Sequence, residues 1–250
     1  MSKHLHHSNK NNLLVRSRSK ASNNVSVSLI SDEPSQGLVY LCVPLLHKLD
    51  FSFVGSCNGL ICIRLSGCET CIILWNLATN EIRIISVLFS VFPSVTLGFG
   101  FNLVSEDYKL VKIMAAQLPL AAHKVVQVWA WRMSAKCWRE LVNFPFPNFV
   151  DKAVGAITGS TIWNSLSMPV LIISVLYWVI FAIDFPATDW IVVAFDLADE
   201  KFQQVPVPED LDHLNGVSKL HLIELEDCLA MSASFSTAGI NCFYIWVRQT

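Results

Sequence analysis

The chain has 250 residues, of which 53% are hydrophobic, and this is enough to fill the core of one large or two ordinary domains. Its 18 basic and 20 acidic side chains leave a net charge of −2, so no global positive field is present to hold a nucleic-acid backbone. The composition therefore indicates a folded protein and excludes a nucleic-acid partner.

The N-terminal 36 residues differ in composition from the rest, and we expect residues 1–36 to form a flexible tail or linker. Residues 1–31 carry five basic side chains and no acidic one. An organelle transit peptide has a similar composition, but the Asn run and the cluster His4, His6 and His7 are more typical of a solvated linker. No apolar core of the secretory kind follows the first charges, so the sequence predicts free thiols and a location in the cytoplasm or nucleus.

Residues 37–250 are predicted to form one mostly β domain. Short apolar runs are separated there by turn residues, and no long stretch shows a convincing helical period. The clearest runs are residues 38–43, 60–65, 72–75, 82–87, 108–114, 125–131, 191–195 and 243–247. Their lengths suit β-strands.

An internal repeat predicts how these strands pair. Each copy has an aromatic residue, a short polar stretch and a second large apolar side chain seven positions after the first, which is typical of a hairpin with both side chains on one buried face. The copies align without gaps: Trp75 to Ala78 with Ile82 and Arg83, Trp131 to Ser134 with Trp138 and Arg139, and Phe195 to Ala198 with Phe202 and Gln203.

The spacing of the copies predicts a propeller. The aromatic positions recur after 56 and 64 residues, and periods of about 50 residues with several strands each are typical of kelch blades. A fourth copy begins at Trp246 and meets Thr250 before its returning strand. We therefore expect an all-β, kelch-like β-propeller of roughly four to five blades, incomplete at its C-terminus.

One apolar run allows two interpretations. Residues 170–183 are apolar at every position but Ser174. The run is shorter than the roughly 20 apolar residues that a spanning helix needs, and its Val, Ile, Tyr, Trp and Phe residues favour strands. We expect buried strands, and the alternative is a membrane-anchored protein that uses residues 162–183 as a transmembrane helix.

Five motifs are specific in combination. They are FVGSCNGLIC at 53–62, LWNLATNE at 74–81, the segment 98–111, the hairpin 128–141 and the segment 191–208. In this order they resemble the F-box-associated domain of plant F-box proteins, whose members read GSCNGLLCL and LWNPSTRE in the first two places. The match runs from about residue 39 to residue 247, and it implies a β-propeller of the kelch type.

The resemblance also implies a function, which is capture of a protein substrate without catalysis. In that family the F-box docks on a Skp-type adaptor of a cullin ubiquitin ligase, and the associated domain holds the protein to be ubiquitylated. The F-box expected before the linker is missing here, so an adaptor is an expected partner only if an F-box is restored upstream. We expect a protein–protein interaction module, working in a ligase complex or as a fragment or decoy, with no cofactor and no membrane partner.

Four cysteines lie close together and resemble a metal site. Cys68 and Cys71 have zinc-ligand spacing, but a complete site needs a second matched pair, and Cys57 and Cys62 are separated by four residues. Both also fall inside the family motif, where they are small buried side chains. We expect thiols and no metal.

The remaining candidates are assigned to turns, loops or the core. The segment GFG at 98–100 is not followed by the Lys-Ser/Thr pair of a phosphate loop, so a tight turn between strands is expected. The acidic sets at 209–212 and 224–227 lack the order of a calcium loop, and the histidines lack a nucleophile or acid partner at motif spacing. The tryptophans at repeat positions are assigned to the core: Trp75, Trp131 and Trp138. The sequence names no substrate-recognition residue.

Overall fold

The structure is a computed structural model that describes residues 12–18, 25–31, 38–41, 50–65, 71–86, 94–117, 124–141, 169–184, 187–208, 217–237 and 240–248. In these residues every regular element is a β-strand, so the all-β prediction is confirmed.

The strands form five antiparallel sheets, each built from consecutive strands of the chain. Sheet A contains β1 (Asn12–Arg18), β2 (Val25–Ser31) and β3 (Leu38–Leu41). Sheet B contains β4 (Phe51–Cys57), β5 (Leu60–Leu65), β6 (Cys71–Asn76) and β7 (Ile82–Ser86). Sheet C contains β8 (Ser94–Asn102), β9 (Asp107–Gln117), β10 (Lys124–Arg132) and β11 (Cys137–Leu141). Sheet D contains β12 (Val170–Ile172), β13 (Val175–Asp184), β14 (Ala187–Asp196) and β15 (Phe202–Val205). Sheet E contains β16 (Val217–Leu225), β17 (Cys228–Thr237) and β18 (Ile240–Val247).

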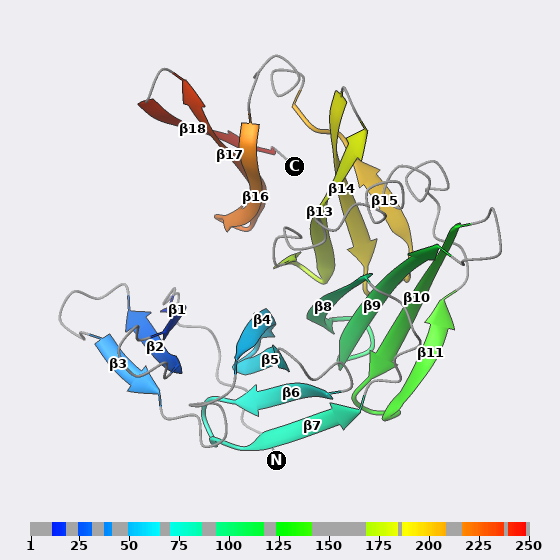
Figure 1. Ribbon diagram of the computed structural model, residues 1–250. Helices are drawn as coiled ribbons and strands as arrows, with labels where there is room; N and C mark the ends of the chain where they lie inside the picture. The colour runs from blue at the N-terminus through cyan, green and yellow to red at the C-terminus, as the bar shows by residue number, and fades with distance from the viewer. Residues whose placement is uncertain are drawn as a thin grey trace.

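The five sheets follow one another in chain order around an arc (Figure 1). First strands make contacts between sheets, β4 with β8 and β12 with β16, and β4 and β8 lie toward the inside of the arc. A radial series of antiparallel sheets is the architecture of a β-propeller. The predicted propeller of four to five blades is therefore confirmed.

Apolar side chains fill the space between neighbouring sheets. Trp75 lies in the cluster between sheets A and B, and Phe99 in the cluster between B and C. Phe195 lies between C and D, and Met231 lies between D and E. Sheets B, C and D thus bury both faces, which explains why their strands include continuous apolar runs rather than a strict alternation.

The repeat forms hairpins, as its pattern predicts. The two large side chains of each copy are direct cross-strand partners: Trp75 with Ile82, Trp131 with Trp138, and Phe195 with Phe202. The first aromatic of each copy, which is Trp75, Trp131 or Phe195, is buried and packs in the cluster toward the preceding sheet. Trp246 has the matching place in β18, the third strand of sheet E, and packs against the cluster toward sheet D.

The apolar run at residues 170–183 forms strands β12 and β13, joined by a turn at Ile173 and Ser174. Leu176 and Trp178 face sheet C, while Val175 and Val179 face sheet E. Burial on both faces accounts for the apolar residues 175–179, while Ile173 in the turn is exposed. In the part of the chain that the structure describes, no helix is long and apolar enough to cross a membrane. Residues 162–168 of the alternative span lie outside that part.

Sheet A begins inside the segment expected to be a tail. Strand β2 reads VSVSLIS, and Val25 and Val27 are buried against sheet B. The alternation of Val with Ser is the pattern of a strand with one buried face. Its serines share the polar composition of the expected tail, so composition alone does not separate β2 from a linker.

The GFG segment is not a turn. Gly98 and Gly100 lie inside strand β8, paired with Val111 and Lys109. A Cβ at Gly100 would meet Leu171 at 2.6 Å, and one at Gly98 would meet Trp178. These glycines therefore allow side chains of sheet D to approach the backbone of sheet C closely.

Candidate functional site

The turns after the first and third strands of each four-stranded sheet lie at one end of the propeller, because each antiparallel strand returns the chain to the opposite end. We call it the turn end. Ser174 joins two of these turns, since its Oγ donates a hydrogen bond to the Phe101 carbonyl at 2.9 Å and accepts one from the Leu103 amide at 3.1 Å.

Side chains of the chain itself shape the turns. Asn76, Asn102 and Asp196 each accept hydrogen bonds at Oδ1 from the amides two and three residues ahead. Lys136 and Glu200 have positive φ angles of 53° and 56° just before the returning strand. Short polar residues and a left-handed position are what such turns require.

At the junction of sheets C and D, the turn end holds a paired cluster of two cations and one carboxylate. Lys109 Nζ lies 2.9 Å from Glu200 Oε1 and also donates to the Leu197 carbonyl, while Arg139 pairs with Glu200 Oε2. Asn102 Nδ2 donates to the same carbonyl at 2.8 Å. Burial alone would raise the pKa of Glu200, but the hydrogen bonds and charges of Lys109 and Arg139 outweigh it and lower the pKa.

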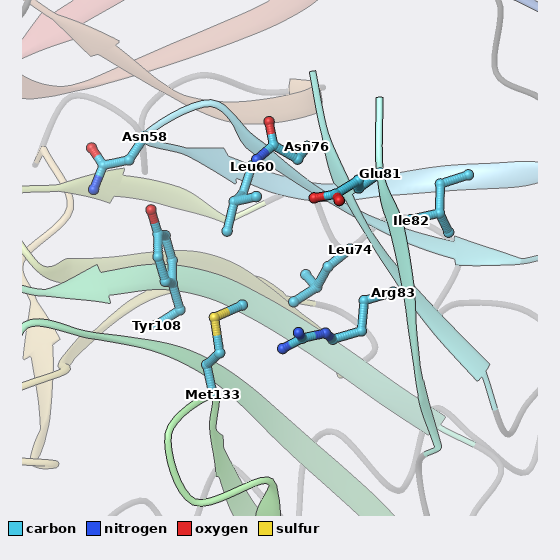
Figure 2. A pocket seen from close by; sticks show the side chains of 9 residues that line it. All are labelled: Asn58, Leu60, Leu74, Asn76, Glu81, Ile82, Arg83, Tyr108 and Met133. Atoms are coloured by element: carbon cyan, nitrogen blue, oxygen red, sulfur yellow. The ribbon is translucent and has the colours of Figure 1, made fainter. Parts of the chain in front are cut away.

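At the junction of sheets B and C, the turn end instead has a cavity of about 590 Å³. Figure 2 shows its lining side chains: Asn58, Leu60, Leu74, Asn76, Glu81, Ile82, Arg83, Tyr108 and Met133. Leu60, Leu74 and Met133 supply apolar surface, and the guanidinium of Arg83 points toward Met133. The Glu81 carboxylate accepts a hydrogen bond from Thr79 Oγ1 at 3.1 Å.

A second cavity, of about 400 Å³, shares Arg83 with the first. It is lined by Arg83, Ile84, Ile85, Ser86, Trp131, Lys136 and Trp138. Among these described lining residues there is no carboxylate. We call the two cavities together the Arg83 groove.

Aromatic rings support the groove from sheet C. Tyr108 stacks on Phe99 with ring centroids 5.8 Å apart, and Trp138 Nε1 donates to the Ser86 carbonyl at 3.1 Å. Burial raises the pKa of Tyr108, and a hydrogen bond with the Asn58 side chain opposes the shift. The Lys112 ammonium lies 5.1 Å from the centroid of Trp138, and burial lowers the pKa of Lys112 to about 8.

The lining of the Arg83 groove suits the binding of another molecule. The described lining residues include no histidine or cysteine, and Ser86 lies beside Arg83 and Trp138 with no general base in the same cavity. Exposed cations beside apolar and aromatic surface are instead typical of a site that recognises another molecule.

The described cysteines of the possible zinc site lie at different places in sheet B. Cys62 is buried in β5, Cys57 ends β4, and Cys71 starts β6 at the other end of the sheet, opposite Ser86. Burial raises the pKa of Cys57 to about 11 and raises that of Cys62 as well, which favours the thiol over the metal-binding thiolate. The described residues contain no group of three or more metal-ligating side chains, and Cys68 lies outside them.

The other candidates are also apart from the groove. Glu224, Glu226 and Asp227 are exposed around the β16–β17 turn, as expected for a solvated connection. His221 is exposed on β16. Residues 209–212 and the other six histidines lie outside the described residues.

Sequence reasoning did not single out Arg83 and Lys136 as site residues. Both stand inside the repeat, next to Ile82 and before Trp138. A comparison of the charges that consecutive copies carry would have found them, because the structure places the last strand of one sheet beside the hairpin turn of the next.

The fold and the groove together define a β-propeller with a candidate binding surface that extends from its turn end along β7. A family model, described as the F-box associated beta propeller domain, matches residues 7–249. The chain belongs to this family.

Two curated relatives come from Arabidopsis thaliana. An F-box/kelch-repeat protein is 24% identical over 213 residues, which are 82% of this chain and 50% of the relative. An F-box protein is 25% identical over 221 residues, 80% of this chain and 48% of the relative. The chain thus spans about half the length of these relatives. Among solved structures, TolB from Acinetobacter baumannii is similar with a TM-score of 0.49 and 8% identity, over 94% of this chain and 49% of that one.

Proposed function

We propose that this propeller is the substrate-recognition part of an SCF-type ubiquitin ligase and that it binds a target protein without catalysing a reaction. The family match over residues 7–249 carries the proposal, and the names of both curated relatives include an F-box. The Arg83 groove supports it, because its lining provides surface for binding and no nucleophile with a base.

Two parts of an F-box protein have separate binding functions. A Skp-type adaptor binds the F-box, and the propeller holds the target. Location in the cytoplasm or nucleus belongs to the same proposal. It is supported by five free thiols, which are Cys57, Cys62, Cys71, Cys137 and Cys228.

The experiment is proximity labelling in plant cells. The chain is expressed with a biotin-ligase tag, and labelled proteins are quantified with and without proteasome inhibition. A target is a labelled protein whose ubiquitylation falls and whose abundance rises when the gene is disrupted. If no labelled protein changes in this way, the ligase-receptor function is wrong and a free binding module remains.

A further inference from the structure

Two neighbouring junctions of the propeller have the same backbone and different charges. Lys136 and Glu200 hold equivalent positions: each follows the repeat aromatic by five residues, and each amide donates to the carbonyl four residues before it, at 2.9 Å. Their φ angles of 53° and 56° also agree.

The arginines beside these turns are equivalent as well. Arg83 follows Ile82, the partner of Trp75, and Arg139 follows Trp138, the partner of Trp131. At the junction of sheets C and D, Arg139 from one sheet pairs with Glu200 on the turn of the next. At the junction of sheets B and C, the equivalent residues are Arg83 and Lys136, and both line one cavity.

At these two equivalent positions, the B–C junction has two cations where the C–D junction has a cation and a carboxylate. Lys109 is a second cation of the C–D cluster, and Glu81 is a carboxylate that lines the first cavity on the other side of Arg83. Among the described residues, neither Arg83 nor Lys136 makes an ion pair, and both side chains are exposed. Like charges held on one small surface attract an anion, and an arginine binds carboxylate or phosphate oxygens with directed hydrogen bonds.

We propose that the Arg83 groove recognises an acidic segment of the target protein, whose anionic side chain lies between Arg83 and Lys136. This anion gives Arg83 the negative charge that Glu200 gives Arg139 at the next junction. The proposal rests on the proposed function and specifies the chemistry of the target.

The first cavity defines what stands beside the anion. Leu60, Leu74 and Met133 offer apolar surface on the other side of Arg83. The preferred segment therefore has an apolar residue next to an acidic or phosphorylated one.

The test uses soluble peptide libraries with random flanks and one fixed central residue, which is Asp, Glu, phosphoserine or, as a neutral match, Asn. The libraries are passed over the immobilised full chain, and retained peptides are quantified by mass spectrometry. We expect at least one anionic library to be retained about tenfold more than the Asn library, the size of one charge-assisted hydrogen bond. The ratio between Asp, Glu and phosphoserine identifies the source of the charge.

Lys136→Glu is the decisive variant. It recreates the charge pattern of Arg139 and Glu200 inside the groove, and Glu200 itself shows that this backbone position accepts glutamate. We expect it to abolish the preference for anions while its melting temperature stays equal to or above that of the wild type. Arg83→Gln should weaken the preference about tenfold.

Lys201→Glu is the matched control. It makes the same charge change on the β14–β15 turn, where the side chain is exposed and outside the groove. Its preference for anions should equal that of the wild type. Equal retention of the Asn and anionic libraries, or a full anion preference in Lys136→Glu, overturns the proposal.

The two proposals fail separately. If ubiquitylated targets exist but bind equally well to Lys136→Glu, recognition of an acidic segment is wrong and the receptor function stands. If acidic peptides bind as described but no labelled protein changes in ubiquitylation and abundance when the gene is disrupted, the proposed recognition of acidic segments stands and the ligase function is wrong.

Discussion

The indole of Trp178 lies against Gly98 of the neighbouring sheet: a Cβ at residue 98 would come within 2.4 Å of Trp178 Cζ2. Trp178 is fully buried, so its ring has no space to move away. Gly98→Ala should therefore lower the free energy of unfolding by about 1 to 3 kcal/mol, as overpacking of a core does. Urea denaturation measures the change.

A second variant tests the cause of this loss. Trp178→Leu removes the ring that the new methyl group meets, although it costs stability by itself. The double variant Gly98→Ala/Trp178→Leu should lose less stability than the sum of the two single variants. Strict additivity would mean that the glycine is needed for another reason.

The Glu200 carboxylate should contribute far more to stability than the Arg139 guanidinium, which is one of its two partners. Lys109 is 5% exposed, so Glu200→Gln leaves a buried ammonium without its counter-charge and should cost about 2 to 3 kcal/mol. Arg139 is 56% exposed, and Arg139→Gln should cost less than about 1 kcal/mol. Chemical denaturation measures the free energy of unfolding of both variants. An equal loss of stability in the two variants would contradict this prediction.

The same carboxylate should contribute to acid sensitivity. Its pKa is lower in the folded protein than the ordinary value of 4.5, so its contribution to stability is present above pH 4.5 and is lost as the pH falls through the lowered pKa. Glu200→Gln should therefore flatten the dependence of the urea midpoint on pH below about 4.5. An unchanged slope would show that other groups control acid unfolding.

Lys112 should produce a dependence of the same sign at high pH. Burial lowers its pKa from 10.5 to about 8, so between these values the unfolded chain binds the proton more tightly than the folded one. Raising the pH through this window removes the advantage of the unfolded state, and stability should rise relative to Lys112→Met. The measurement is the urea midpoint of the wild type minus that of Lys112→Met, which should increase from pH 8 to pH 10.5.

Thiol labelling should rank the cysteines by exposure. Cys137 is exposed on β11 and should react with iodoacetamide at the rate of an unfolded chain. The pKa of Cys57 rises from 9.0 to about 11, which lowers its thiolate fraction about a hundredfold, and Cys62 is fully buried. Peptide mass spectrometry after timed labelling should find Cys62 protected until the protein unfolds. Rapid labelling of Cys62 would place it outside the core.

The hairpins were predictable to the residue, because an aromatic and a second apolar side chain seven positions later can share a buried face in only one register. Trp75 and Ile82 are partners for this reason. Strand β2 was missed because an alternation of Val with Ser has the composition of a linker, and Gly98 was assigned to a turn because sequence does not show that a tryptophan of another sheet lies above it.

The groove was beyond sequence reasoning for a related reason. Arg83 and Lys136 are far apart in the chain and are typical surface residues when considered singly. Only the packing of sheet B on sheet C brings them into one cavity, and only the ion pair at the next junction shows which charge the groove lacks.

Each core cluster joins a sheet to the sheet that precedes it in the chain, and this has a consequence for synthesis. A ribosome releases the sheets in the order A to E, so every new blade finds its docking surface already made. Only the newest apolar face is uncovered at any moment, and it is covered once the next few strands emerge. Such a chain can be completed one blade at a time, with little time for its sheets to pair with those of a neighbouring nascent chain.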